Sequence, residues 1–248
     1  FYLPLKLLET TRGCPHRCDF CGVSTFFGYR YRNRPLREID QELATLFKKG
    51  PVMNPFSKRI LSLFNRDLPY FLKKRLLYII DSNIAGDKRF ALNLASLLKD
   101  YDLLWYGHAP VSIAFDEKLL EGFSKSGCIA INIGFESFSP RNLKTMGKGF
   151  NQPSLYEEAV KRIHQYGIGI MGTFIVGLDD DDSGVFQRII DFCILTQLDW
   201  ALAFIMAPYP GTESFQRLEK EGRIFCWDWE KYDSLHAVYP VSYTHLRA

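Results

Sequence analysis

The sequence predicts an α/β fold in the form of a partial (β/α)6 TIM-like barrel. Six short apolar runs recur along the 248 residues, and amphipathic helical patterns fill the stretches between them. The apolar runs are nearly continuous rather than alternating, which is typical of parallel strands buried on both faces. Six units are too few for the usual eight-stranded barrel, so a partial barrel or an open doubly wound sheet would accommodate them. In both folds the ligand site lies at the carboxyl ends of the strands.

The strands are expected at residues 5–11, 76–81, 103–111, 129–136, 168–178 and 200–207. The helix expected at 153–166 has Pro153 at its start, His164 in its last turn and Gly167 just beyond, which is the usual start and stop chemistry. The helix expected at 185–195 places its apolar residues on one face, and the last helix covers 212–221. Residues 48–74 do not follow this alternation of strands and helices. They are basic and rich in Phe, and we interpret them as an insertion or lid.

Composition excludes several classes of protein. The net charge of +3 does not require a polyanionic partner, so nucleic acid binding is not indicated. The longest apolar run, at 168–178, is far shorter than the roughly 20 residues of a membrane-spanning helix, and no signal peptide is evident. Six cysteines in a chain of this length do not form a disulfide framework, which favours a reducing cytoplasm.

Both ends of the chain look cut. The sequence opens on Phe1 without an initiator Met, so we expect an upstream portion to be missing. Residues 241–248 have no continuity with the preceding pattern and resemble a translated sequencing adapter, so they are excluded from fold reasoning. One domain is expected over residues 1–240.

Three cysteines are crowded directly after the first expected strand. Cys14, Cys18 and Cys21 are separated by three and then two residues. Three thiolates can hold three irons of a 4Fe-4S cluster and leave the fourth iron open for a ligand. The same spacing would also fit one face of a helix, but Gly13 and Pro15 disfavour a continuous helix there. A structural zinc site is the stronger alternative, although it needs a fourth ligand.

The cysteine motif resembles the signature of the radical S-adenosylmethionine (SAM) superfamily, including an aromatic residue, Phe20, before the last cysteine. The resemblance implies a radical SAM barrel, a 4Fe-4S cluster held by Cys14, Cys18 and Cys21, and SAM bound to the open iron. In that family an electron from the reduced cluster cleaves SAM to methionine and a 5'-deoxyadenosyl radical, which abstracts hydrogen from a substrate. It also implies a reductant such as flavodoxin or ferredoxin.

Further motifs are similar to the branch whose members often carry an upstream cobalamin-binding domain. These motifs lie at residues 10–15, 81–83, 133–137, 172–177 and 208–212, and the resemblance runs from about residue 7 to 238. The branch includes methyltransferases and relatives of the anaerobic magnesium-protoporphyrin ester cyclase. The resemblance therefore implies cobalamin bound by a missing upstream domain. It does not hold at residues 48–74.

Polar residues follow two of the strands. Asp81 and Asn83 leave the second strand, where the resemblance implies contacts to the amino end of SAM, but an Asx turn or a helix cap ahead of 87–99 would explain them equally. Glu136 and Ser137 end the fourth strand. A carboxylate at the end of a buried strand needs a partner, and a ribose hydroxyl would be a good one.

Other positions have functional and structural interpretations of similar weight. Gly172 sits in a bulky strand and suits either close approach of adenosine or tight packing. Tyr209 belongs to a turn that the resemblance places near adenine. His108 ends the third strand and could face substrate, although a structural histidine is commoner. The three remaining cysteines are expected in the core.

The sequence thus favours a SAM-cleaving radical enzyme, with a non-catalytic iron–sulfur or zinc-binding module as the alternative. The substrate is not specified, because one barrel hosts many chemistries.

Overall fold

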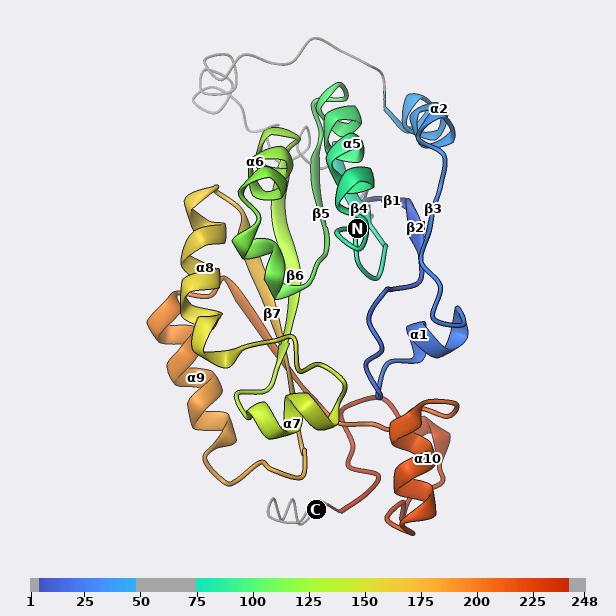
Figure 1. Ribbon diagram of the computed structural model, residues 1–248, viewed down its shortest axis with the longest axis vertical. Coiled ribbons are helices and arrows are strands. Elements are labelled where there is room, and N and C mark those ends of the chain that lie inside the picture. Colours follow the sequence, from blue (N-terminus) through green and yellow to red (C-terminus); the bar gives the residue numbers. More distant parts are fainter. Residues whose placement is uncertain (1–4, 48–74, 241–248) are drawn as a thin grey trace.

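The structure is a computed structural model that describes residues 5–47 and 75–240. The expected lid at 48–74 and the expected artefact at 241–248 lie outside the described residues. Within them, the fold is built on one large parallel sheet and a small antiparallel pair of strands (Figure 1).

The large sheet has six parallel strands in the order β1-β4-β5-β6-β7-β8, which confirms all six expected strands. The strands are β1 (Lys6–Leu8), β4 (Leu76–Ile79), β5 (Leu104–His108), β6 (Cys128–Glu136), β7 (Gly169–Val176) and β8 (Trp200–Ile205). Each strand pairs with the one that follows it along the sheet, so the chain winds in one direction. A doubly wound sheet would reverse its order at an internal strand. The partial barrel is therefore the observed form.

Helices α5 (Lys88–Lys99), α6 (Glu117–Lys125), α8 (Tyr156–Gln165) and α9 (Val185–Thr196) run along the sheet, as Figure 1 shows. Two other helices, α7 (Pro140–Thr145) and α10 (Glu213–Lys220), lie at its lower end in that view. Side chains of Asp87, Asp116, Ser139 and Thr212 accept a backbone N–H in the first turns of α5, α6, α7 and α10. These caps stabilise each helix by about 1 kcal/mol. The expected helix at 153–166 is confirmed, with a 3-10 turn at Pro153–Leu155 before α8.

The main core lies between the sheet and these helices. Phe135 of β6 contacts the rings of Tyr156, Phe174 and Phe192, with centroids 4.8 to 5.6 Å apart. Aromatic contacts of this kind add about 0.5–1.5 kcal/mol each to the burial of apolar area. Strands β6 and β7 therefore form a rigid base for whatever binds at their carboxyl ends.

A second, smaller core cluster lies at those carboxyl ends. It joins Met146, Ile175, Leu178 and Met206 to Phe215 and Leu218 of α10, and Phe20 packs against it. Because Phe20 lies between two of the crowded cysteines, this cluster anchors the cysteine loop to the barrel.

The cysteine loop is closed by the small sheet, in which β2 (Thr11–Arg12) pairs antiparallel with β3 (Arg32–Asn33). Between them lie the three cysteines and the short helix α1 (Gly22–Phe26), and β3 is followed by α2 (Leu36–Leu46). No helix within the described ranges is both long and apolar enough to cross a membrane.

Candidate functional site

The backbone of the cysteine loop is held at several points. Gly13 has a φ of +86°, and the carbonyl of Arg30 occupies the space that a Cβ would need. The hydroxyl of Ser24 donates to the carbonyl of His16 at 2.8 Å, and the N–H of Cys21 donates to the carbonyl of Cys18 at 3.2 Å. These contacts hold the backbone of the cysteine loop in place.

All three thiols face one cavity of about 490 Å³ at the carboxyl ends of β4 to β8. Side chains from five strands or strand ends complete its wall, including Asn83, His108, Asn132, Glu136, Thr173, Phe204 and Tyr209. The location agrees with the rule that parallel barrels bind ligands at this end.

The three cysteines are half-buried and lie close enough to influence one another electrostatically. Burial raises the pKa of Cys14, and it raises the pKa of Cys18 to about 12. A free thiolate is thus costly at these positions. Iron ligation would replace the thiol proton with a cation, which removes that cost.

The spacing of the thiols bears on the kind of metal they fit. Within 5–47 and 75–240, no three His, Cys, Asp or Glu side chains converge closely enough to hold a single metal ion. A mononuclear zinc site requires such convergence. In a cuboidal cluster each thiolate binds a different iron, so its ligands stand farther apart. Three half-buried thiols around an open cavity are a donor set that fits a cluster with three cysteine ligands and one open iron.

Glu136 and Lys148 form an ion pair in the cavity wall, with Oε1 and Nζ 2.6 Å apart and side chains about a tenth exposed. The register of β6 with β7 shifts between Gly134 and Glu136, and Glu136 has a φ of +64°. A positive φ at a residue with a side chain costs about 1–3 kcal/mol and often occurs at functional sites. Gly134 leaves space for this pair, since a Cβ there would collide with both partners.

Asn83 and Asp81 have different surroundings, although the sequence analysis placed both at the end of the second strand. Asn83 lines the cavity; its Oδ1 accepts the N–H of Ala85 at 3.0 Å, and its Nδ2 lies 3.7 Å from the sulfur of Cys14. Asp81 is 1% exposed and lies outside the cavity wall. It accepts hydrogen bonds from the N–H and hydroxyl of Thr10 and from the hydroxyl of Thr11. Asp81 thus links β4 to the segment that leads into the cysteine loop.

The remaining expected residues divide in the same way. Phe20 and Tyr209 line the cavity, and the Tyr209 hydroxyl lies 3.0 Å from that of Ser234. Ser137 is buried behind the wall, where its hydroxyl accepts the N–H of Ser139. Gly172 faces the core, because a Cβ there would press on Leu198 and on the ring of Phe135. Neither Ser137 nor Gly172 lines the cavity.

Several cavity residues carried no clear sequence signal. Lys148 and Phe150 come from the loop after α7, and Phe150 stacks on His16 with ring centroids 4.1 Å apart. Asn132 lies within β6 and follows the strand period, so its side chain could only be assigned to this face once the register was known. His108, which the sequence analysis named as a residue that could face substrate, does line the cavity; it pairs with the hydroxyl of Tyr78 at 2.7 Å, and burial lowers the pKa of its ring.

The other three cysteines do not line this cavity. Cys128 is buried and its thiol donates to the carbonyl of Ala130 at 3.5 Å. Cys193 packs against the main core and Cys226 against the second cluster. Their positions agree with the core interpretation from the sequence.

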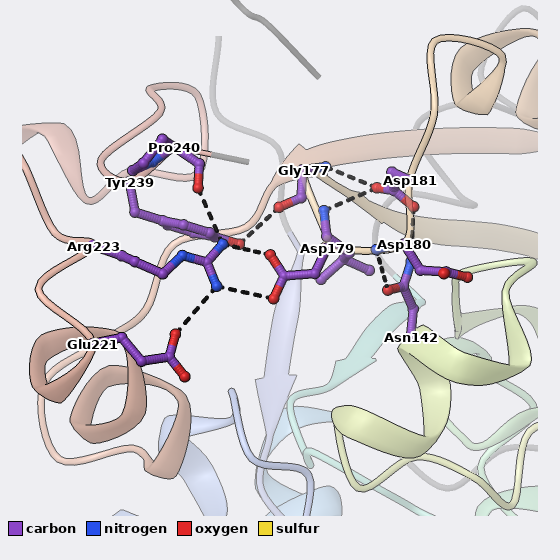
Figure 2. Close-up of polar contacts among 10 residues, drawn as sticks. Asn142, Gly177, Asp179, Asp180, Asp181, Glu221, Arg223, Tyr239 and Pro240 are labelled. Carbon is purple, nitrogen blue, oxygen red and sulfur yellow. Dashed lines mark hydrogen bonds and ion pairs between the residues drawn. The ribbon is translucent and has the colours of Figure 1, made fainter. Parts of the chain in front are cut away.

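A larger cavity of about 600 Å³ lies beside α7, α10 and the loop 178–182. Figure 2 shows that the carboxylates of Asp179 and Asp181 in this loop are engaged by internal partners. Arg223 pairs with Asp179, and Asp181 accepts the N–H groups of Gly177 and Leu178. The loop is thus a structural turn, and the chemistry-bearing side chains gather in the smaller cavity.

The fold and the cavity define a parallel partial barrel with a three-cysteine loop at its ligand-binding end. The sequence profile of the Radical SAM superfamily matches residues 8–57. The chain is 30% identical over 238 residues to bacteriochlorophyllide d C-12(1)-methyltransferase of Chlorobaculum tepidum, a match that covers 96% of this chain and 47% of the relative. It is 26% identical to the anaerobic magnesium-protoporphyrin IX monomethyl ester cyclase of Rubrivivax gelatinosus, over 94% of this chain and 38% of that protein. The chain therefore matches the Radical SAM superfamily profile over residues 8–57 and is similar to these relatives over nearly its whole length.

Solved structures share the fold. The fold matches the radical SAM methyltransferase TsrM from Kitasatospora setae, solved with cobalamin and a [4Fe-4S] cluster bound, with a TM-score of 0.70 and 18% identity. That match covers 88% of this chain and 39% of TsrM. The chain thus spans less than half the length of each of these three relatives.

Proposed function

We propose that this protein is a radical SAM enzyme in which Cys14, Cys18 and Cys21 hold a 4Fe-4S cluster. The observation that carries the proposal is the meeting of these three half-buried thiols in one cavity at the carboxyl ends of the barrel strands. When bound, the reduced cluster supplies the electron that cleaves SAM and generates a radical for hydrogen abstraction.

The chain's own residues would bind and orient the cofactors. Asn83 has its amide nitrogen toward the Cys14 sulfur, and a donor in that position stabilises negative charge on a thiolate. Phe20 packs into the cluster of apolar residues behind the loop and keeps water from that side. The cysteines therefore stay in one arrangement while the open side of the cavity receives the ligand.

The Glu136–Lys148 pair suits the amino acid end of SAM. That end carries an ammonium and a carboxylate, and the cavity wall offers one carboxylate and one ammonium as complements. In a partly buried site such charge-assisted hydrogen bonds are about twice as strong as neutral ones. We assign Lys148 to the SAM carboxylate and Glu136 to the ammonium or to a ribose hydroxyl. Tyr209 at the far wall is assigned to the adenine side.

Cobalamin-dependent methyl transfer is the proposed outcome of the reaction on a substrate that stays unassigned. It is supported by the names of the methyltransferase relatives and by the cobalamin bound in TsrM. A cyclisation like that named for the Rubrivivax protein is the second candidate. Flavodoxin or ferredoxin is the proposed reductant, and the free cysteines suit the reducing cytoplasm.

Reductive cleavage of SAM tests the proposal directly. The protein is reconstituted anaerobically with iron and sulfide, reduced with dithionite and given SAM, and 5'-deoxyadenosine and methionine are quantified. We expect both products from the unmodified chain and none from Cys14→Ala, Cys18→Ala or Cys21→Ala, because loss of one thiolate removes one iron ligand.

The matched control replaces the other three cysteines together. A variant with Cys128→Ala, Cys193→Ala and Cys226→Ala should retain the cluster and SAM cleavage, because these side chains lie outside the cavity. Loss of the cluster in this folded variant would show that the ligand assignment is wrong.

A further inference from the structure

Asp19 is a charged residue inside the cysteine motif whose side chain turns away from the cysteine cavity. It follows Cys18 directly and precedes Cys21 by two positions, so its Cα is within about 3.8 Å of the Cα of Cys18. The neighbouring Cys18, Phe20 and Cys21 line the smaller cavity, whereas Asp19 lines the larger cavity on the other side of the loop.

The Asp19 carboxylate is buried and poorly compensated. The residue is 8% exposed, and neither carboxylate oxygen has a hydrogen bond. Arg217 of α10 places its Nη1 3.2 Å from Oδ2, while the negative charge of Glu213 on the same helix repels the carboxylate. The attraction is therefore mainly Coulombic, and the Arg217 side chain is 38% exposed, so solvent screens the positive partner more than the negative one.

The backbone of Asp19 is tied on both sides. Its N–H donates to the carbonyl of Met146 at 2.9 Å, and its carbonyl accepts the N–H of Ser214 at 3.1 Å. These bonds join the loop to the end of α7 and to the first turn of α10. The backbone of Asp19 is thus tied to both helices that flank the cysteine loop.

We propose that the Asp19–Arg217 ion pair sets the reduction potential of the cluster, with Asp19 lowering it and Arg217 raising it. This inference rests on the proposed function, since it requires the cluster on Cys14, Cys18 and Cys21. Reduction adds one negative charge to the cluster, which a nearby carboxylate disfavours and a nearby guanidinium favours. Net charge and exposure are among the factors that tune such potentials. Both residues act on the cluster through the electric field of their charges and do not bind it. They are therefore positioning residues and not ligands.

The test is a redox titration of the reconstituted chain at pH 8, followed by electron paramagnetic resonance of the reduced cluster. Asp19→Asn should raise the midpoint potential, because it removes the negative charge and keeps the side-chain shape. Arg217→Gln should lower it, and Arg217→Lys, which keeps the charge, should stay closer to the unmodified protein. The double variant of Asp19→Asn and Arg217→Gln should fall between the two single variants.

Asp182→Asn is the matched control. Asp182 borders the same larger cavity, but its side chain is 65% exposed and pairs with Arg188, so its charge is screened and the potential should not move. Equal midpoint potentials in all variants would overturn the inference. Shifts of Asp19→Asn and Arg217→Gln in the same direction would also overturn it, because a loosened loop would change the potential of both variants alike. Absence of a cluster from the unmodified chain would instead contradict the proposed function and this inference with it.

Discussion

The Glu136–Lys148 ion pair lies in the cavity wall, and the proposed function assigns it to SAM. Lys148→Ala should weaken SAM binding to the reconstituted protein about ten- to a hundredfold, because a hydrogen bond to a charged group contributes about 1.5–3 kcal/mol. Isothermal titration calorimetry with SAM under anaerobic conditions measures this loss of affinity.

Removal of one partner also leaves the other charge buried and unpaired, which destabilises the fold. The control is therefore the double variant of Glu136→Gln and Lys148→Met, which removes both charges and should recover much of the stability while SAM binding stays weak. Full SAM affinity in that variant would contradict the assignment of this pair to the cofactor.

Asp81 has a different expected phenotype, because its carboxylate is occupied by Thr10 and Thr11. Asp81→Ala would leave these buried donors without an acceptor, at about 1–3 kcal/mol for each unsatisfied group. Thermal or urea unfolding should show the loss of stability. In the variant that remains folded, SAM affinity should change less than in Lys148→Ala. A large loss of affinity with unchanged stability would instead indicate direct contact with the cofactor.

At the scale of elements, the contact between β6 and β7 depends on a glycine. A Cβ at Gly172 would lie 2.7 Å from Leu198 and 3.2 Å from the Phe135 ring. Gly172→Ala should therefore destabilise the protein by about 1–3 kcal/mol through overpacking, while the purified folded fraction still binds the cluster. Denaturant unfolding of the two proteins gives the difference in free energy.

Gly122→Ala is the matched control within α6. Its Cβ would meet Leu92 and Ala95 at the ordinary distances of 3.5 and 3.7 Å. Alanine in a helix interior is favoured over glycine by about 1 kcal/mol, so this variant should be as stable as the unmodified chain or more stable. If Gly172→Ala were equally harmless but reduced SAM affinity, that result would support the interpretation of close adenosine approach and contradict the packing one.

The sequence predicted the elements better than it predicted the cavity. Continuous apolar runs identified all six strands because burial on both faces leaves few polar positions. Lys148 could not be found this way, since it lies in a loop with no spacing motif, and only the bulge at Glu136 brings the two charges together. Asp81 was grouped with Asn83 by proximity in sequence, whereas the turn after β4 directs one side chain to Thr10 and the other to the cavity.

At the scale of the whole molecule, the barrel brings together segments that are far apart in sequence. The cysteine loop comes from residues 13–31, Lys148 from the loop after α7, and Tyr209 from the turn after β8. The second core cluster joins these parts through Phe20, Met146 and Met206. Cluster assembly is therefore expected to stabilise the fold as a whole, because a ligand that binds only the folded state shifts unfolding to higher temperature.

Electron paramagnetic resonance of the reduced, reconstituted protein, recorded with and without SAM, tests the central claim most directly. Three thiolates should hold one 4Fe-4S cluster for each chain and leave one iron open, so addition of SAM should change the resonance. A cluster signal that SAM does not alter would indicate a non-catalytic iron–sulfur module. A colourless protein that binds stoichiometric zinc in place of iron would contradict the assignment of the site altogether.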